Sequence, residues 1–155
     1  MIHGPGNKGN LTLLYKFIKM GIPYPLGAFE NKRSFTSIEN LIFILEQIIK
    51  RDIASGIYQI ADNEALSTNE VIKQIAMALG KKERIWKVNQ RLIKQMAKLG
   101  DLLHLPFNSE RLKKLTENYV VSNKKLIEAL STPLPVSSRE GLLHTLRSFS
   151  KTPHL

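Results

Sequence analysis

One arginine in this sequence, Arg33, has neighbours that suit it to hold a phosphate or a diphosphate. Arg33 lies beside a short predicted strand, residues 34–36, and directly before a predicted helix start at Ser37. Arg111 lies in the first turn of a short predicted helix that begins at Ser109. A guanidinium presents a planar fork of donors that pairs bidentately with phosphate oxygens. Most arginines are ordinary exposed residues, so neither position specifies a ligand without its neighbours.

Two other patterns imitate a cofactor loop and a catalytic pair. Residues 4–9 have the Gly-x-Gly-x-x-Gly spacing of a dinucleotide-binding loop, but that loop needs a full strand before its first glycine, and only three residues precede it. Tyr15 and Lys19 share a helix face, where a lysine can lower the pKa of a catalytic tyrosine. The serine or threonine partner and the upstream cofactor site that this chemistry needs are missing. We interpret both patterns as coincidences and expect no catalytic residue and no metal site.

The elements that must position the arginines are mostly helices. Hydrophobic residues at helical spacing predict helices over 11–20, 38–51, 68–79, 90–105, 109–115, 123–130 and 138–149. Strands are predicted over 34–36, 56–62 and 84–88, and the two prolines of 22–27 predict an extended edge segment. Helix starts are marked by Asn10 and Ser37 as N-caps and by capping boxes at residues 67–70 and 137–140.

The composition is that of a water-soluble globular domain. The chain has 155 residues, 43% of them hydrophobic and 23% charged, which suffices for one domain with a sizeable core. It has no cysteine, which excludes a disulfide framework and a thiolate metal site. No apolar run reaches the length of a transmembrane segment, and no segment resembles a signal peptide. A cytoplasmic location is therefore expected.

The net charge of +10 favours polyanionic partners and leaves alternatives open. The positive residues are scattered and aromatic residues make up only 7%, so solvated faces are expected; a basic nucleic-acid-binding module is the alternative function. The amphipathic segment 90–105 places Leu92, Ile93, Met96, Leu99 and Leu103 on one face. We expect this face to pack against the domain. The alternative is that the opposite, basic face, marked by Arg91, Lys94, Lys98 and Asp101, contacts anionic lipid.

The order of short motifs resembles a known family. These motifs are His3-Gly4-Pro5-Gly6, Asn10-Leu11, the segment 22–27, the segment Asn31 to Leu41, the segment 56–62, and residues 122–125 and 133–142. Together they resemble the C-terminal half of extended short-chain dehydrogenase/reductases, the NAD-dependent nucleotide-sugar epimerases, dehydratases and 4-reductases. The resemblance covers nearly the whole chain.

The resemblance implies an α/β fold, namely the helix-rich C-terminal part of a Rossmann-type short-chain dehydrogenase with a few short strands. Residues 1–150 would form the substrate-binding portion and 151–155 a frayed tail. In this family the N-terminal half carries the NAD loop and the catalytic tyrosine and lysine, so we expect a fragment that is inactive alone. His3 and Gly4 would approach NAD only when that half is present. An open sheet edge would favour a homodimer.

The resemblance also assigns substrate contacts. The implied substrate-binding residues are Asn10, Leu11, Tyr24, Leu26, Arg33, Phe35 and Arg111. Asn10 and the backbone of Leu11 would meet the diphosphate and its sugar, Tyr24 and Leu26 would flank the base, and the two arginines would clamp the phosphates. Phe35 replaces a tyrosine common in the family and Lys114 replaces an aspartate, so a hydroxyl contact is lost and the ribose contact is in doubt. The expected ligand is a UDP-N-acetylhexosamine or UDP-hexose used in making surface polysaccharides.

Overall fold

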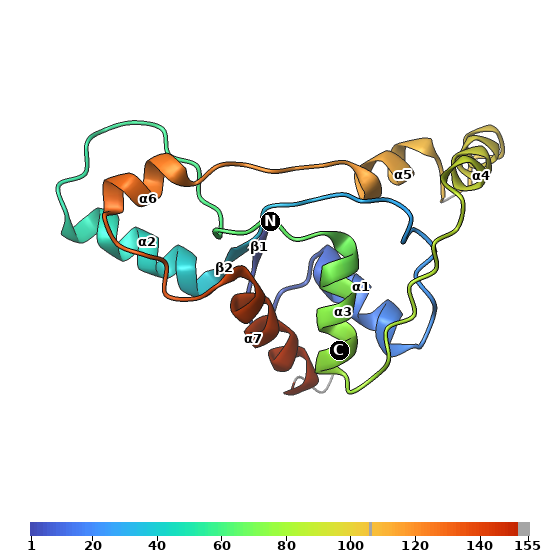
Figure 1. Ribbon diagram of the computed structural model, residues 1–155, viewed down its shortest axis with the longest axis horizontal. Coiled ribbons are helices and arrows are strands. Elements are labelled where there is room, and N and C mark those ends of the chain that lie inside the picture. Colours follow the sequence, from blue (N-terminus) through green and yellow to red (C-terminus); the bar gives the residue numbers. More distant parts are fainter. Residues whose placement is uncertain (106, 152–155) are drawn as a thin grey trace.

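The computed structural model describes residues 1–105 and 107–151, and the predicted tail at 152–155 lies outside them (Figure 1). In chain order the elements of this part are β1 (Ile2–His3), α1 (Asn10–Lys19), β2 (Thr36–Ser37), α2 (Ile38–Lys50), α3 (Thr68–Ala78), α4 (Gln90–Leu102), α5 (Ser109–Thr116), α6 (Lys124–Leu130) and α7 (Ser138–Lys151). The helix-rich α/β architecture expected from the sequence is confirmed.

The sheet is small and its strands are far apart in sequence. β1 pairs with β2 in parallel, with Ile2 opposite Thr36 and His3 opposite Ser37. The backbone just before β2 pairs with a different segment in an antiparallel bridge, because the Arg33 N–H donates to the Leu66 carbonyl at 2.9 Å and the Leu66 N–H donates to the Arg33 carbonyl at the same distance. These two hydrogen bonds hold the Arg33 backbone in place and so determine the point from which its side chain extends.

Two predicted strands are not formed as strands. The predicted strand 56–62 is irregular, and its contact with the sheet backbone is made by the Asp62 N–H, which donates to the Phe35 carbonyl at 2.8 Å. The predicted strand 84–88 makes only isolated bridges, Ile85 with Tyr24 and Lys87 with Leu26. A segment with alternating apolar and polar residues forms a strand only where another backbone pairs with it over several residues. These two segments pair with another backbone only at single residues.

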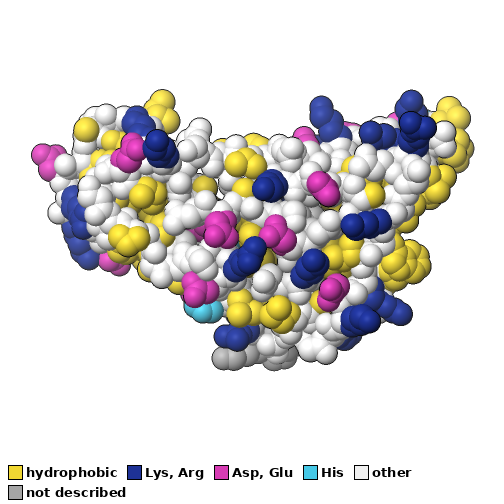
Figure 2. Space-filling view, in the orientation of Figure 1, with side chains coloured by type: hydrophobic (Ala, Val, Ile, Leu, Met, Phe, Trp, Pro, Cys, Tyr) yellow, Lys and Arg dark blue, Asp and Glu magenta, His cyan; other side chains and the backbone are white. Residues whose placement is uncertain are grey.

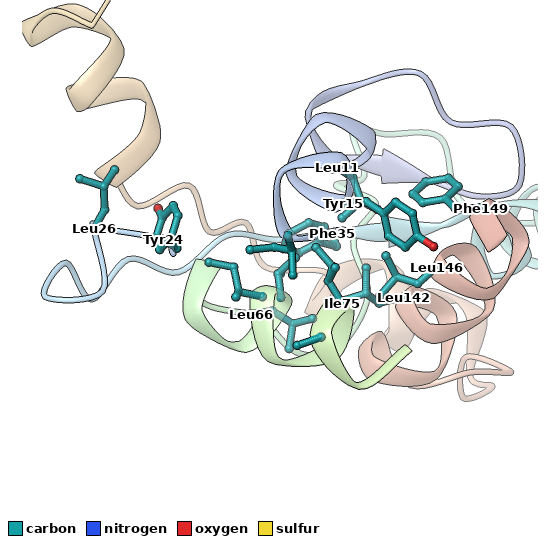
Figure 3. Close-up of a cluster of buried hydrophobic side chains, with 14 of the residues drawn as sticks. Leu11, Tyr15, Tyr24, Leu26, Phe35, Leu66, Ile75, Leu142, Leu146 and Phe149 are labelled. Carbon is teal, nitrogen blue, oxygen red and sulfur yellow. The ribbon is translucent and has the colours of Figure 1, made fainter. Parts of the chain in front are cut away.

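The main core lies between α1, α3 and α7 (Figures 1 and 3). Tyr15 of α1 and Phe149 of α7 meet edge to face with ring centroids 5.2 Å apart, and Ile75 of α3 and Leu146 of α7 are fully buried. Figure 3 shows Tyr24 and Leu26 set apart from these side chains, although both are buried. Both nevertheless belong to the main hydrophobic cluster, and they also line the larger cavity described below.

A second, smaller hydrophobic cluster joins α2 to α6 at the other end of the molecule (Figure 1). Its buried members are Ile44, Leu126 and Leu130. The Arg51 side chain, just after α2, donates to the Leu130 carbonyl and ties the same two helices together. Two cores of unequal size thus hold the described chain.

Most predicted helix starts are confirmed, and one N-cap is wrong. The Ser37 hydroxyl accepts the Asn40 N–H at 3.1 Å, and Ser67 forms a complete capping box with Glu70. Asn10 is not an N-cap but the first residue of α1, which Gly9 precedes as N-cap without a side-chain bond. Asn10 is thereby free to face a cavity.

Helix α4 buries a different side from the one expected. Its buried residues are Ile93, Ala97 and Gly100, whereas the predicted apolar face is largely exposed. A Cβ at Gly100 would lie 1.9 Å from the Phe107 carbonyl oxygen, so the missing side chain allows α4 to approach the backbone before α5. The prediction is confirmed for Ile93 and wrong for Leu92, Met96, Leu99 and Leu103, because α4 also packs through the small residues Ala97 and Gly100.

Candidate functional site

A cleft between α1, α4, α5 and two extended segments is the candidate functional site. It consists of a cavity of about 750 Å³ and an adjoining one of about 100 Å³, and Asn10, Leu14 and Leu115 line both. Six of the seven predicted substrate-binding residues line one or both cavities: Asn10, Leu11, Tyr24, Leu26, Arg33 and Phe35. The fold thus gathers residues that the sequence separates by up to 25 positions.

The larger cavity has apolar walls held by backbone pairing. The Tyr24 N–H donates to the Arg84 carbonyl and the Trp86 N–H donates to the Tyr24 carbonyl, each at 2.8 Å. Gly27 makes this pairing close, because a Cβ there would lie 2.3 Å from Cγ2 of Ile85. The pairing places Tyr24 and Leu26 on one side of the cavity, with Trp86 among the other lining residues.

The phenol of Tyr24 remains a neutral hydrogen-bonding group at physiological pH. Burial raises its pKa to about 12, while the charge of Arg33 acts in the opposite direction. The Tyr24 ring therefore offers an apolar face and an uncharged hydroxyl to a ligand in the larger cavity.

Arg33 supplies a positive charge to the smaller cavity. Its Nη2 donates to the Lys114 carbonyl oxygen on α5, which fixes the guanidinium. Its Nε is buried and has no hydrogen-bond partner among the described residues. A buried donor without a partner is costly, and an anion in this cavity would satisfy it.

Arg111 is not among the residues lining the cleft. It is exposed in the first turn of α5, and its backbone N–H donates to Oδ1 of Asn108 at 2.9 Å. It stands one helical turn before Leu115, which lines both cavities, and so lies on the same side of α5. The structure therefore brings Arg33 to the cleft and leaves the Arg111 side chain at the rim of the helix that borders it.

His3 and Gly4, the predicted cofactor contacts, lie in the interior and do not line the cleft. His3 Nδ1 is 2.9 Å from the Thr145 hydroxyl, which itself donates to a carbonyl of α7, so the proton resides on Nδ1. Burial lowers the pKa of His3 to about 4, with the N-terminal ammonium adding to the effect. A Cβ at Gly4 would lie 2.6 Å from Cγ2 of Ile38. Their role toward a cofactor stays a prediction.

Asp62 and Ser67 both have structural roles, and Ser67 caps α3 as expected. The Asp62 carboxylate accepts the Ser37 N–H at 3.1 Å and Nδ2 of Asn40 at 2.7 Å, which ties residue 62 to the start of α2. Burial raises the pKa of this carboxyl, and these hydrogen bonds oppose the rise. Neither residue lines the cleft.

Sequence reasoning missed part of the apolar wall. Trp86, Leu14 and Leu115 line the larger cavity but were not predicted. Trp86 carried a signal, because it is the only tryptophan and stands in a segment otherwise rich in charge. The leucines carried none, since leucines on amphipathic helices are ordinarily core residues.

The cleft joins an apolar cavity to a smaller one that contains a positive charge. A flat apolar ring fits the larger cavity, and an anionic group fits the smaller one beside Arg33. Among residues 1–105 and 107–151 there is no group of three His, Asp or Glu side chains that would hold a metal ion. No described helix has the length and apolar character needed to cross a bilayer.

Comparison with known proteins places this fold. No protein-family model matches the sequence. Over 151 residues, 96% of the chain, the sequence is 29% identical to UDP-glucose 4-epimerase of Vibrio cholerae, of which it covers 44%. The chain therefore spans less than half the length of this curated relative.

Solved structures also match nearly all of this chain, which again covers less than half of each of them. A dTDP-glucose 4,6-dehydratase of Bacillus anthracis in complex with NAD has a TM-score of 0.66 at 17% identity, over 99% of this chain and 43% of the dehydratase. The Bordetella bronchiseptica enzyme WbmG in complex with NAD and UDP has a TM-score of 0.66 at 14% identity, over 97% of this chain and 42% of WbmG. UDP-glucose 4-epimerase of Thermus thermophilus in complex with NAD has a TM-score of 0.62 at 19% identity, over 96% of this chain and 44% of the epimerase. The fold expected from the motif order is confirmed.

Proposed function

We propose that this chain, which has the fold of the C-terminal part of extended short-chain dehydrogenases, is the nucleotide-sugar-binding portion of an NAD-dependent epimerase, dehydratase or 4-reductase. The observation that carries the proposal is the cleft, in which an apolar cavity continues into a smaller one beside a fixed arginine. The proteins that share the fold support it, since they include sugar-nucleotide epimerases and a dehydratase.

In this proposal the ligand lies along the cleft with its base in the apolar part. The base packs against Tyr24 and Leu26, where Trp86 also contributes wall surface. The diphosphate lies beside Arg33, whose unpartnered Nε donates to it, and beside Asn10, which lines both cavities. Phosphate oxygens are strong acceptors for a guanidinium, so this contact would orient the whole nucleotide.

Arg111 would complete the phosphate clamp from the rim. Its side chain is exposed, and it lies on the same side of α5 as Leu115. A turn of this long side chain toward the cleft would bring a second guanidinium to the diphosphate. Phe35 lines the smaller cavity without a hydroxyl, so the two arginines would carry more of the phosphate recognition.

We assign substrate binding to this chain and hydride chemistry to another part of the enzyme. The NAD loop and the catalytic tyrosine and lysine of such enzymes precede the region that this chain resembles. NAD would then be held chiefly by that other part, with His3 and Gly4 near the junction. We propose a UDP-N-acetylhexosamine or a UDP-hexose as the ligand.

The single tryptophan provides the test. Because Trp86 lines the larger cavity, a base that enters should change its fluorescence. We expect a saturable change with UDP and UDP-N-acetylglucosamine, and none with inorganic phosphate at the same concentration. The variant Arg33→Met should weaken UDP binding about tenfold or more, because a charge-assisted hydrogen bond is lost.

The control is Arg147→Met, which removes an exposed arginine of α7 that does not line the cleft. It should leave the UDP titration unchanged. A folded chain whose tryptophan fluorescence does not respond to UDP, or responds equally in both arginine variants, would contradict the proposed function.

A further inference from the structure

A continuous stripe of large apolar side chains is exposed along α4. It consists of Leu92 (50% exposed), Met96 (51%), Leu99 (57%) and Leu103 (63%) at the end of the helix. Their spacing of three and four residues places them on one side of the helix. Single exposed apolar residues are common, whereas a contiguous stripe marks an interaction surface.

The stripe is additional to the surface that holds α4 in the fold. The helix packs through Ile93, Ala97 and Gly100, which are buried on a different side. The stripe borders the cleft at Met96, which lines the larger cavity, whereas Leu92, Leu99 and Leu103 do not line it. An apolar stripe is expected to contact an apolar partner. The charged residues around the stripe indicate the chemical class of that partner.

The chain around the stripe is strongly basic. Residues 84–100 contain five lysines and arginines and no aspartate or glutamate. Two of them, Lys94 and Lys98, line a hollow of about 290 Å³ between α4 and α5 together with Lys113, and no carboxylate lines it. Figure 2 shows hydrophobic side chains along the outer edge at α4 with lysines and arginines beside them.

We propose that α4 docks on the surface of an anionic lipid bilayer. By helical spacing, Lys94 and Lys98 lie on the side of α4 away from the stripe. This division into an apolar side and a basic side is the pattern of helices that lie in the headgroup region, with the apolar side toward the acyl chains. The helix has 13 residues, about 20 Å, which is too short to span a hydrocarbon core of about 30 Å. The helix therefore lies in the plane of the surface. This inference does not rest on the proposed nucleotide site.

Vesicle co-sedimentation tests the apolar half of the proposal. The 155-residue chain should sediment with vesicles of phosphatidylcholine mixed with phosphatidylglycerol and not with phosphatidylcholine alone. The double variant Leu92→Glu/Leu99→Glu, whose positions do not line the cleft, should lower the partition coefficient at least about tenfold.

The matched control is Ile42→Glu/Ile49→Glu on α2, at the far end of the molecule (Figure 1). These residues have the same seven-residue spacing and are 51% and 84% exposed. The control should sediment like the unmodified chain. An equal loss of vesicle binding in both double variants would overturn the proposal, because the loss would then come from the overall hydrophobicity or charge of the chain and not from α4.

A second pair of variants tests the basic half. Lys94→Glu/Lys98→Glu should lower binding to the anionic vesicles about tenfold, since each basic residue near the surface contributes to attraction. Lys16→Glu/Lys73→Glu, on exposed positions of α1 and α3, changes the net charge equally and should have a much smaller effect.

Two further results would overturn the proposal. One is a folded chain that fails to bind the anionic vesicles. The other is a mass, measured by light scattering without lipid, that falls from dimer to monomer in Leu92→Glu/Leu99→Glu while vesicle binding is absent. The stripe would then be a contact between two copies of the chain. Circular dichroism of every variant confirms that it is folded.

Discussion

At the scale of single residues, the buried histidine of β1 makes folding sensitive to acid. His3 has its pKa lowered to about 4 by burial, against 6.5 when unfolded. The unfolded chain therefore takes up the proton first as the pH falls. The stability that neutral His3 contributes is fully present above pH 6.5 and is lost progressively toward pH 4.

We expect this proton uptake to lower the free energy of unfolding by about 3 kcal/mol across that range. Asp62 has the opposite sign, because burial raises the pKa of its carboxyl, but it is present in any His3 variant and its contribution largely cancels in a comparison. Urea unfolding of the unmodified chain and of His3→Gln at a series of pH values measures the difference. Equal slopes in the two proteins would show that His3 is not the titrating group.

The sequence predicted some of the residues that line the cleft. Tyr24, Leu26 and Arg33 were assigned because the order of their motifs resembles a family, and all three line the cleft. Trp86 was missed because its place depends on a pairing across about 60 residues with Tyr24. Arg111 was assigned by its motif, but the direction of an exposed, flexible side chain is not encoded in helix spacing.

At the scale of elements, helix starts were predictable because they depend on neighbours in sequence. The capping box of Ser67 and Glu70 is entirely local, and it formed as expected. The strand predicted over 56–62 depends on a distant backbone to pair with, and it did not form. The buried side of α4 depends on the shape of what it meets, and Ala97 and Gly100 determined it.

The close approach at Gly100 gives a prediction about α4. Replacing glycine by alanine within a helix is ordinarily stabilising by up to about 1 kcal/mol. In Gly100→Ala the new methyl group would lie 1.9 Å from the backbone oxygen of Phe107, so the helix must move. We expect a loss of about 1–3 kcal/mol in the free energy of unfolding, measured by urea denaturation.

Gln95→Ala, at an exposed position of the same helix, is the comparison for this substitution. It improves helix propensity without a steric contact and should change stability by less than about 0.5 kcal/mol. A stabilised Gly100→Ala protein would mean that α4 is not seated against the segment before α5.

At the scale of the whole molecule, the two hydrophobic clusters predict unequal local stability. The main core joins α1, α3 and α7, whereas the α2–α6 cluster has three buried residues, Ile44, Leu126 and Leu130. Amide protons exchange through local opening, and the opening free energy follows the buried contacts of each unit. Amides of α6 should therefore exchange faster than those of α3.

Hydrogen exchange followed by mass spectrometry checks this order. The substitution Leu126→Ala should speed exchange further in α6 and in the adjoining part of α2, while α3 and α7 keep their protection. Uniform acceleration through all helices would show instead that the chain opens as one cooperative unit.

The division into two cores has a consequence for altering the chain. The cleft takes its lining from α1, α3, α4, α5 and nearby extended segments, and neither α2 nor α6 contributes a residue to it. Ser55 and Gly56 are exposed, and neither belongs to the smaller cluster. A peptide epitope or a fluorescent reporter inserted there would leave the lining of the cleft unchanged, so this end can be lengthened without altering the proposed binding residues.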